Sequence, residues 1–262
     1  MKRFLSLGAG VQSSTLALMI AHGEIEPVEA AIFADTGWEP RKVYEWLDWL
    51  EKQLPFPVYK VQHGNLRQDI LNKQQGIRVA AIPWHMMMPN GDRAMGRRQC
   101  TMEYKIQPLT RKTRELLDLK PGQRAKEVLC EMLIGISTDE ALRMKPAKEA
   151  WKRHRWPLIE KSMSRSDCLA WMERKGYPLP PKSSCIGCPF HNDHEWRAIK
   201  ADTEAWTDAL EVDAAIRQQP GMRGQQFMHR SCVPLDQVDL STAADHGQVD
   251  MFNNECEGMC GV

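Results

Sequence analysis

A glycine-rich segment near the start of the chain constrains the fold more than any other feature. Residues 3–7 have the length and hydrophobicity of a strand, the sequence Leu-Gly-Ala-Gly at residues 7–10 breaks that pattern, and helical spacing of apolar residues resumes at residues 13–22. A turn from a strand into a helix exposes backbone N–H groups at the positive end of the helix dipole, so it can bind phosphate without a lysine. The residues expected to contact a nucleotide here are Ser6, Gly8, Gly10, Gln12, Ser13 and Ser14.

The rest of the N-terminal half alternates strand-like and helix-like runs. Further strands are predicted at residues 28–34, 57–62 and 127–136, a helix opens at Pro40, and another covers residues 106–117. Residues 82–96 are expected to form a loop, and residues 156–159 a last short strand. Short connections between alternating elements predict an α/β fold with a doubly wound parallel sheet of about five strands.

Helical signals dominate the C-terminal half. Ser164 and Asp167 have capping-box spacing, Gly176 stands where a helix should end, and two more helices are predicted at residues 193–201 and 204–218. We therefore expect one nucleotide-binding α/β domain over residues 1–240, with a cysteine-bearing helical C-terminal part. Residues 241–262 lack periodicity and are expected to form a mobile tail.

Composition and charge narrow the class of protein. The chain has 262 residues and a net charge of +1, and no apolar run approaches the roughly 20 residues that span a bilayer. We expect a cytoplasmic protein with no membrane partner, and the net charge excludes the global electrostatics of a strongly basic nucleic-acid binder. Residues 141–156 nevertheless carry six Lys or Arg against Glu149, which is typical of a solvated face and equally of a contact for nucleic-acid phosphates.

Polar residues follow the second predicted strand. Asp35 and Thr36 stand at its carboxyl end, where open α/β sheets bind ligands. We therefore count both as candidate nucleotide-binding residues, with Asp35 suited to a ribose hydroxyl or a magnesium ion. The same Asp is equally suited to capping the helix that opens at Pro40.

Eight cysteines in a reducing compartment indicate metal or redox chemistry more than disulfides. Cys185 and Cys188 form a C-x-x-C followed by proline, a tight turn that points two thiolates at one ion or cluster. Cys100 lies far upstream among basic residues that lower thiol pKa values and attract anions. Cys130 and Cys168 fall within strand and helix patterns, so we interpret them as core residues.

The segments SLGAGVQSST and FADTGWEPRKVYEWLDWL, at residues 6–15 and 33–50, resemble the opening of the phosphoadenosine-phosphosulfate (PAPS/APS) reductase family. That family belongs to the adenine-nucleotide alpha-hydrolase-like superfamily, so the resemblance implies this fold with an adenine nucleotide as substrate. ATP-cleaving relatives carry an Asp where this chain has Ser13. The resemblance therefore favours the branch that binds an already adenylated sulfate.

The resemblance also implies a 4Fe–4S cluster. Cys100, Lys105, Pro108, Cys185 and Cys188 follow the order of the cluster-binding reductases, although Gln99 replaces the first cysteine of their tandem pair. Cys232 is our preferred fourth ligand. An open iron site with three protein ligands and a zinc ion bound by the same four cysteines are the alternatives. The resemblance also implies four anion-binding residues, which are Arg97, Arg98, Lys105 and Arg143.

The last residues resemble the Glu-Cys-Gly C-terminus on which such reductases carry a nucleophile. By this resemblance Cys256 is the catalytic thiolate and Cys260 resolves the product, with an external thiol such as thioredoxin as the reductant. The expected activity is thiol-dependent reduction of an adenylated sulfate to sulfite. The alternatives are an ATP-dependent sulfurtransferase that thiolates a base in tRNA or DNA, and a non-enzymatic nucleotide-sensing module.

Overall fold

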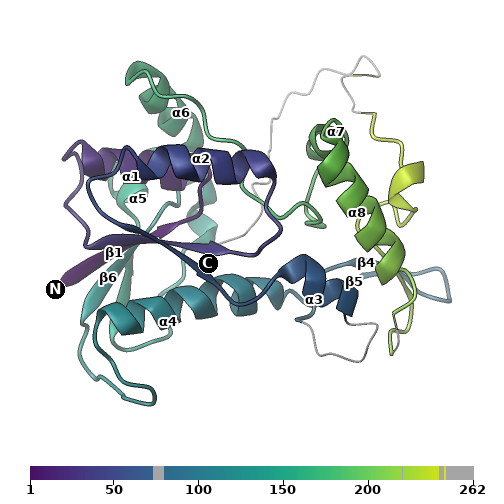
Figure 1. Cartoon of the computed structure of the whole chain (residues 1–262), viewed down its shortest axis with the longest axis horizontal. Helices are drawn as coiled ribbons and strands as arrows, with labels where there is room; N and C mark the ends of the chain where they lie inside the picture. The colour runs from purple at the N-terminus through teal and green to yellow at the C-terminus, as the bar shows by residue number, and fades with distance from the viewer. Residues whose placement is uncertain (73–79, 220, 242–244, 246–262) are drawn as a thin grey trace.

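The protein is described by a computed structural model that covers residues 1–72, 80–219, 221–241 and 245. At its centre is a parallel sheet in the order β3-β2-β1-β6-β7 (Figure 1). The strands are β1 (Lys2–Leu7), β2 (Ala30–Asp35), β3 (Val58–Gln62), β6 (Cys130–Ile134) and β7 (Lys152–Arg155). The predicted α/β fold with a five-stranded parallel sheet is therefore confirmed.

Helices cover both faces of this sheet (Figure 1). On one face lie α1 (Val11–Ala21), α2 (Arg41–Glu51), α5 (Pro157–Glu160) and α6 (Arg165–Arg174), and on the other lies α4 (Gln107–Leu116). Each face of the sheet has its own hydrophobic core, and successive residues of β1 point into different cores. Leu5 packs with α1 and α2, whereas Phe4 packs with Met132 and Leu116. Burial on both faces explains why the sequences of β2 and β6 are nearly continuous apolar runs.

A smaller antiparallel sheet lies beside the main one, in the order β5-β4-β8. It consists of β4 (His85–Met87), β5 (Arg93–Met95) and β8 (Gln225–Phe227). Strand β8 contacts α8 (Thr203–Ile216), and α8 in turn packs against α3 (Leu66–Asn72) and α7 (Asp193–Lys200) (Figure 1). The prediction of a loop at residues 82–96 was therefore wrong. Three-residue strands are too short to show periodicity, and β4 pairs with a strand far along the chain.

The last strand of the main sheet was also placed wrongly. Residues 156–159 were expected to form it, but β7 is the preceding charged segment and Pro157 opens helix α5. An edge strand of a sheet tolerates charged residues, so hydrophobicity did not reveal it. A π-helix (Thr101–Ile106) extends the N-terminus of α4, and 3-10 helices cover Thr138–Arg143 and Leu235–Gln237.

The capping box at Ser164 and Asp167 is confirmed at the start of α6. Cys130 and Cys168 are fully buried in the core, as their sequence context predicts. Within the described part of the chain, none of the helices has the length and hydrophobicity needed to cross a membrane. Cys256 and Cys260, the predicted catalytic pair, lie outside the described residues.

Candidate functional site

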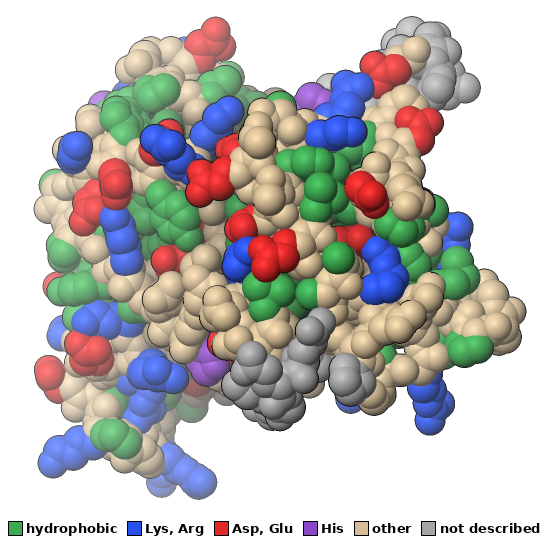
Figure 2. Space-filling view, turned by 45° about the vertical axis from the view of Figure 1, so that its right-hand side comes forward, with side chains coloured by type: hydrophobic (Ala, Val, Ile, Leu, Met, Phe, Trp, Pro, Cys, Tyr) green, Lys and Arg blue, Asp and Glu red, His purple; other side chains and the backbone are tan. Residues whose placement is uncertain are grey.

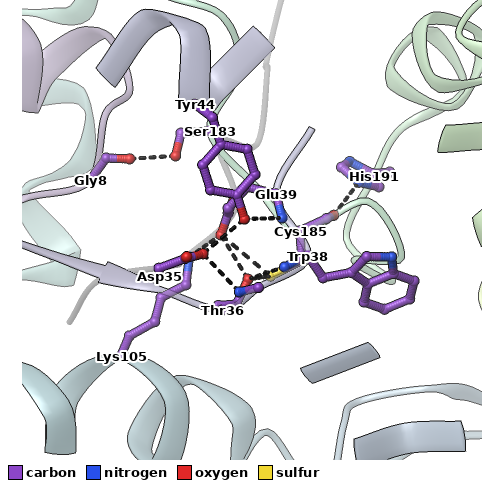
Figure 3. Close-up of polar contacts among 11 residues, drawn as sticks. Gly8, Asp35, Thr36, Trp38, Glu39, Tyr44, Lys105, Ser183, Cys185 and His191 are labelled. Carbon is purple, nitrogen blue, oxygen red and sulfur yellow. Dashed lines mark hydrogen bonds and ion pairs between the residues drawn. The ribbon is translucent and has the colours of Figure 1, made fainter. Parts of the chain in front are cut away.

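The glycine-rich turn lies between the carboxyl end of β1 and the first turn of α1. Gly10 is the N-cap of α1 with an extended backbone, and Ala9 adopts a left-handed conformation with a φ of 57°. The Gly8 N–H donates to the Ser13 hydroxyl at 3.2 Å, and the Ser183 hydroxyl donates to the Gly8 carbonyl (Figure 3). These contacts fix the turn both from within and from a distant segment.

Close packing also holds this turn against the end of β6. A Cβ atom on Gly135 would lie 2.8 Å from the backbone nitrogen of Ser13, so a larger residue at position 135 would displace the turn. The turn is therefore in backbone contact with the segment after β6, at the carboxyl edge of the central strands.

Two side chains predicted to bind the nucleotide make internal contacts instead of lining the edge of the sheet. The Ser14 hydroxyl is fully buried and accepts the Trp46 indole N–H at 2.9 Å, which ties α1 to α2. The Gln12 amide donates to Ser137 at 3.3 Å and to Glu140 at 3.1 Å, which ties α1 to the loop after β6.

Asp35 organises the turn that follows β2. Its Oδ1 atom accepts the Gly37 N–H at 2.7 Å and the Tyr44 hydroxyl at 2.8 Å (Figure 3). Burial, followed by the hydrogen bond to Asp35, raises the pKa of Tyr44. The alternative role predicted for Asp35, capping of the helix that opens at Pro40, was wrong, because the N-cap of α2 is Pro40 and no side chain caps this helix. Asp35 instead stabilises the turn between β2 and α2.

A cavity of about 300 Å³ opens at the carboxyl ends of β1, β2 and β6, on the face covered by α4. We call it the lysine cavity. Its apolar walls include Phe33, Met102 and Leu109, and the predicted residues Ser6 and Gly8 form part of its rim. Its charged lining consists of Lys105, Lys145, Lys148, Lys152 and Glu149. Four lysines against one glutamate make the lysine cavity attractive to an anion.

Of the lysines that line this cavity, the sequence analysis identified Lys105 as an anion-binding residue and did not identify the other three. Lys145, Lys148 and Lys152 belong to the basic run at residues 141–156, which was weighed as a solvated face or a nucleic-acid contact. Lys152 is buried, and its Nζ atom lies 3.1 Å from Glu149. His154, at the same cavity, has its pKa lowered by burial. The basic run did indicate a site for an anion. Its position at a cavity could not be predicted, because that position depends on the pairing of β7 with β6.

Three of the predicted metal-ligating cysteines line a second, small cavity of about 30 Å³, which we call the cysteine pocket. Cys100 precedes the π-helix, and Cys185 and Cys188 come from the C-x-x-C turn. The Cys185 thiol lies 3.3 Å from the Thr36 hydroxyl and donates to Glu39 at 3.6 Å. The structure thus brings these three cysteines to the same pocket as Thr36, a predicted nucleotide-binding residue.

Glu39 is a site residue that the sequence analysis did not identify. Its side chain is buried, and its Oε1 atom accepts the Thr36 hydroxyl at 3.1 Å (Figure 3). Its Oε2 atom has no hydrogen-bond partner within the described structure. A glutamate just before Pro40 and a predicted helix has the sequence context of an exposed first-turn residue, so no sequence signal indicated this role.

Lys105 connects the two cavities. Its side chain lines both the lysine cavity and the cysteine pocket, and its Nζ atom lies 3.4 Å from Glu39 Oε1. Figure 3 shows Lys105 extending from the helical layer beneath the sheet toward Asp35 and Glu39. An anion held by Lys105 would therefore lie at the boundary between the lysine cavity and the thiols.

The other predicted anion-binding arginines lie in three different places. Arg98 lines the cysteine pocket and stacks on Phe190 at 5.4 Å from the ring centre. Arg97 lines a separate cavity. Arg143 forms an ion pair with Glu140.

Cys232, the preferred fourth metal ligand, is not among the residues that line the cysteine pocket. Burial raises the pKa of its thiol, with Arg93 and Arg217 acting in the opposite direction. In the described ranges, no three His, Cys, Asp or Glu side chains converge to hold a metal ion. The thiol chemistry of the pocket suits iron or zinc, but the observed arrangement is not a formed metal site, so we derive no step through such a group.

Charges on the face shown in Figure 2 are mixed, with Lys or Arg interspersed among Asp and Glu. No single sign of charge covers this face. Binding of an anion on this face would therefore depend on local clusters of basic side chains.

No protein-family model and no curated protein sequence matches the chain. Among solved structures, the chain is similar to the phosphoadenylyl-sulfate (PAPS) reductase from Candida auris in its phosphate complex, with a TM-score of 0.42 and 15% sequence identity. The match covers 69% of this chain and 75% of that chain. A likeness this distant assigns neither activity nor ligand, so the function has to be argued from the site.

Proposed function

We propose that this chain is an adenine-nucleotide-binding enzyme of sulfur chemistry that reduces an adenylated sulfate to sulfite. The observation that carries the proposal is Lys105, which lines both the lysine cavity and the cysteine pocket. A ligand with an adenine at one end and an activated sulfate at the other matches an apolar, lysine-lined cavity that adjoins thiols.

Binding of the nucleotide follows from the walls of the lysine cavity. Phe33, Met132 and Ile134 offer apolar surface for the adenine ring, and the lysines offer positive charge for phosphate and sulfate. The rim residues Ser6 and Gly8 belong to the glycine-rich turn, which adds backbone donors at the N-terminus of α1.

The reaction requires two thiols and one external reductant. A cysteine thiolate attacks the sulfate sulfur, the bond from sulfur to the phosphate oxygen breaks, and AMP leaves with that electron pair. A second thiolate then attacks the Sγ atom of the cysteine adduct, so a disulfide forms while the bond from Sγ to the sulfonate sulfur breaks and sulfite leaves with that electron pair. A dithiol such as thioredoxin reduces this disulfide and supplies the two electrons. We assign the attack to Cys256 and the resolution to Cys260.

Lys105 would stabilise the charge that develops as the bond from sulfur to the leaving phosphate breaks, because a buried cation acts strongly in a site of low dielectric constant. Glu39 holds the Lys105 ammonium group in place. The three thiols of the cysteine pocket are the donors that a 4Fe–4S cluster or a zinc ion would use. Iron, sulfide and zinc analysis of anaerobically purified protein tests that part of the proposal.

Calorimetry with AMP and an adenylated sulfate, combined with a sulfite-release assay, tests the function. Lys148→Glu should weaken binding of both ligands at least tenfold, because it reverses an exposed charge of the cavity lining. Lys161→Glu, at an exposed position outside that lining, is the matched control. Cys256→Ser should bind normally and release no sulfite; unchanged release would remove Cys256 from the mechanism.

The second candidate, ATP-dependent transfer of sulfur to a nucleic-acid base, is favoured by one observation. A further cavity shares Ile82 and Trp84 with the cysteine pocket, on the side of the protein that contains the small sheet. An acceptor could therefore approach the thiols from that cavity. Transfer predicts ATP consumption and a thiolated product, whereas reduction predicts sulfite without ATP.

A further inference from the structure

His154 lines the lysine cavity, and the proposed function gives it no role. It belongs to β7 and is paired in register with Met132 of β6. Met132 packs with Phe4 in the core on the α4 side of the sheet. Paired residues of neighbouring strands point to the same face, so the side chain of His154 points to the α4 side, where the lysine cavity opens.

One nitrogen of the His154 ring is used within the protein. Its Nδ1 atom lies 2.8 Å from the carbonyl oxygen of Lys145. A carbonyl oxygen only accepts hydrogen bonds, so Nδ1 carries a proton and donates it. In a neutral imidazole the other nitrogen, Nε2, then has no proton and is an acceptor.

Burial favours this neutral form of His154. It lowers the pKa of His154 below its ordinary value, and the charge of Lys152 acts in the same direction. The hydrogen bond with the Lys145 carbonyl and the charge of Glu149 oppose this shift without reversing it. At neutral pH, Nε2 is therefore an acceptor in a cavity whose charged lining is mostly lysine.

The Nε2 atom of His154 is accessible to a ligand. In the described structure it has no hydrogen-bond partner, and it is not one of the unpaired polar atoms that are shielded from solvent. Glu149, the carboxylate in the cavity lining, differs because Lys152 holds its Oε2 atom at 3.1 Å. The cavity thus offers lysines to anionic groups and the Nε2 atom of His154 to a neutral N–H donor.

We propose that His154 binds the exocyclic amino group of the adenine, with Nε2 as the acceptor of one N–H. Met132, its neighbour on β6, belongs to the apolar wall that the proposed function assigns to the adenine ring. Neighbouring strands lie about 4.8 Å apart, so the acceptor stands next to the edge of that ring. The inference rests on the proposed function, because it concerns the base of the nucleotide proposed for the same cavity.

Purine riboside 5′-monophosphate is the matched probe, because it differs from AMP only in lacking the amino group. Calorimetry of the full chain should show AMP binding about fivefold more tightly, as expected for one hydrogen bond to a neutral acceptor. IMP should also bind more weakly than AMP, because it places a carbonyl oxygen against the lone pair of Nε2. Equal affinities for AMP and either probe would overturn the inference.

Two substitutions test the residue itself. His154→Asn keeps a donor for the Lys145 carbonyl but has no atom at the position of Nε2, and His154→Leu removes both nitrogens. In each variant AMP should bind about fivefold more weakly, down to the affinity of the purine nucleotide, which should change less than about twofold. His194→Leu, at an exposed position in α7, is the control and should keep the preference for AMP. A preference that persists in His154→Asn would assign the amino group to another acceptor and overturn the inference.

The sulfite-release assay separates this inference from the proposed function. A chain that binds AMP and releases sulfite, but does not distinguish AMP from the purine nucleotide, contradicts the role of His154 alone. A preference for AMP that depends on His154, without sulfite release, contradicts the reduction alone. Absence of AMP binding would overturn both.

Discussion

The Nζ atom of Lys105 lies 3.4 Å from the Oε1 atom of Glu39, and both side chains are largely buried. Lys105 comes from the π-helix before α4, and Glu39 comes from the segment between β2 and α2. The pair therefore joins structural layers on opposite faces of the sheet. Because Glu39 also accepts hydrogen bonds from the Thr36 hydroxyl and the Cys185 thiol, one carboxylate contacts the lysine, a neighbouring hydroxyl and one of the thiols.

Replacement of Glu39 by Gln should lower the free energy of unfolding by about 1–3 kcal/mol at neutral pH. Gln keeps the shape and one acceptor oxygen, but it leaves the buried Lys105 ammonium group without this carboxylate. Urea denaturation measures the change. Glu45→Gln is the control, because its pair with Arg41 is exposed on α2 and should contribute less than about 1 kcal/mol. Equal losses for the two variants would contradict the positioning role of Glu39.

Ser14→Ala should destabilise the protein and leave nucleotide affinity within about threefold. The substitution removes the acceptor for the buried Trp46 indole N–H, which costs about 1–3 kcal/mol. Thermal unfolding and AMP calorimetry measure the two effects. Ser166→Ala, at an exposed position in α6, controls for loss of a hydroxyl. Unchanged stability together with a tenfold loss of affinity would restore Ser14 as a nucleotide ligand.

Most of the main sheet could be predicted from the sequence, because its central strands β2 and β6 are buried along almost their whole length. Strands β1, β2, β3 and β6 each gave a local apolar signal of strand length. Strand β7 gave none, since its sequence Lys-Arg-His-Arg is charged and its position depends on pairing with β6. The small sheet depends on pairing between residues far apart in the chain, which local patterns do not encode.

The sequence predicted correctly that three cysteines lie close together, whereas their role as metal ligands stays a prediction. Cys185 and Cys188 are held together by their turn, and Cys100 joined them through the order of motifs. The burial of a polar side chain and the direction in which it points could not be predicted from the sequence. Ser14 was therefore expected to contact the ligand, and Glu39 was not considered. Whether a polar side chain points into a cavity or into the core depends on its neighbours in the folded structure, such as Trp46 for Ser14.

Glu195 stabilises the loop that contains Cys185 and Cys188, and this contribution should depend on pH. His191 joins the Cys185 carbonyl, at 3.0 Å, to the Glu195 carboxylate, at 3.3 Å, and Lys182 lies 2.5 Å from the same carboxylate. Burial alone would raise the pKa of Glu195, but the hydrogen bonds with His191 and Lys182 outweigh it and lower this pKa from 4.5 to about 2.

A carboxyl whose pKa is lower in the folded state stabilises that state above its unfolded pKa, and the contribution is lost as pH falls through the folded pKa. Glu195→Gln should therefore be less stable than the unmodified protein by about 1–3 kcal/mol at pH 7. The difference should shrink between pH 4.5 and about 2. Urea unfolding at several pH values measures it, with the exposed Glu204→Gln in α8 as the control. A difference that stays constant down to pH 2 would show that Glu195 acts through shape and not through its charge.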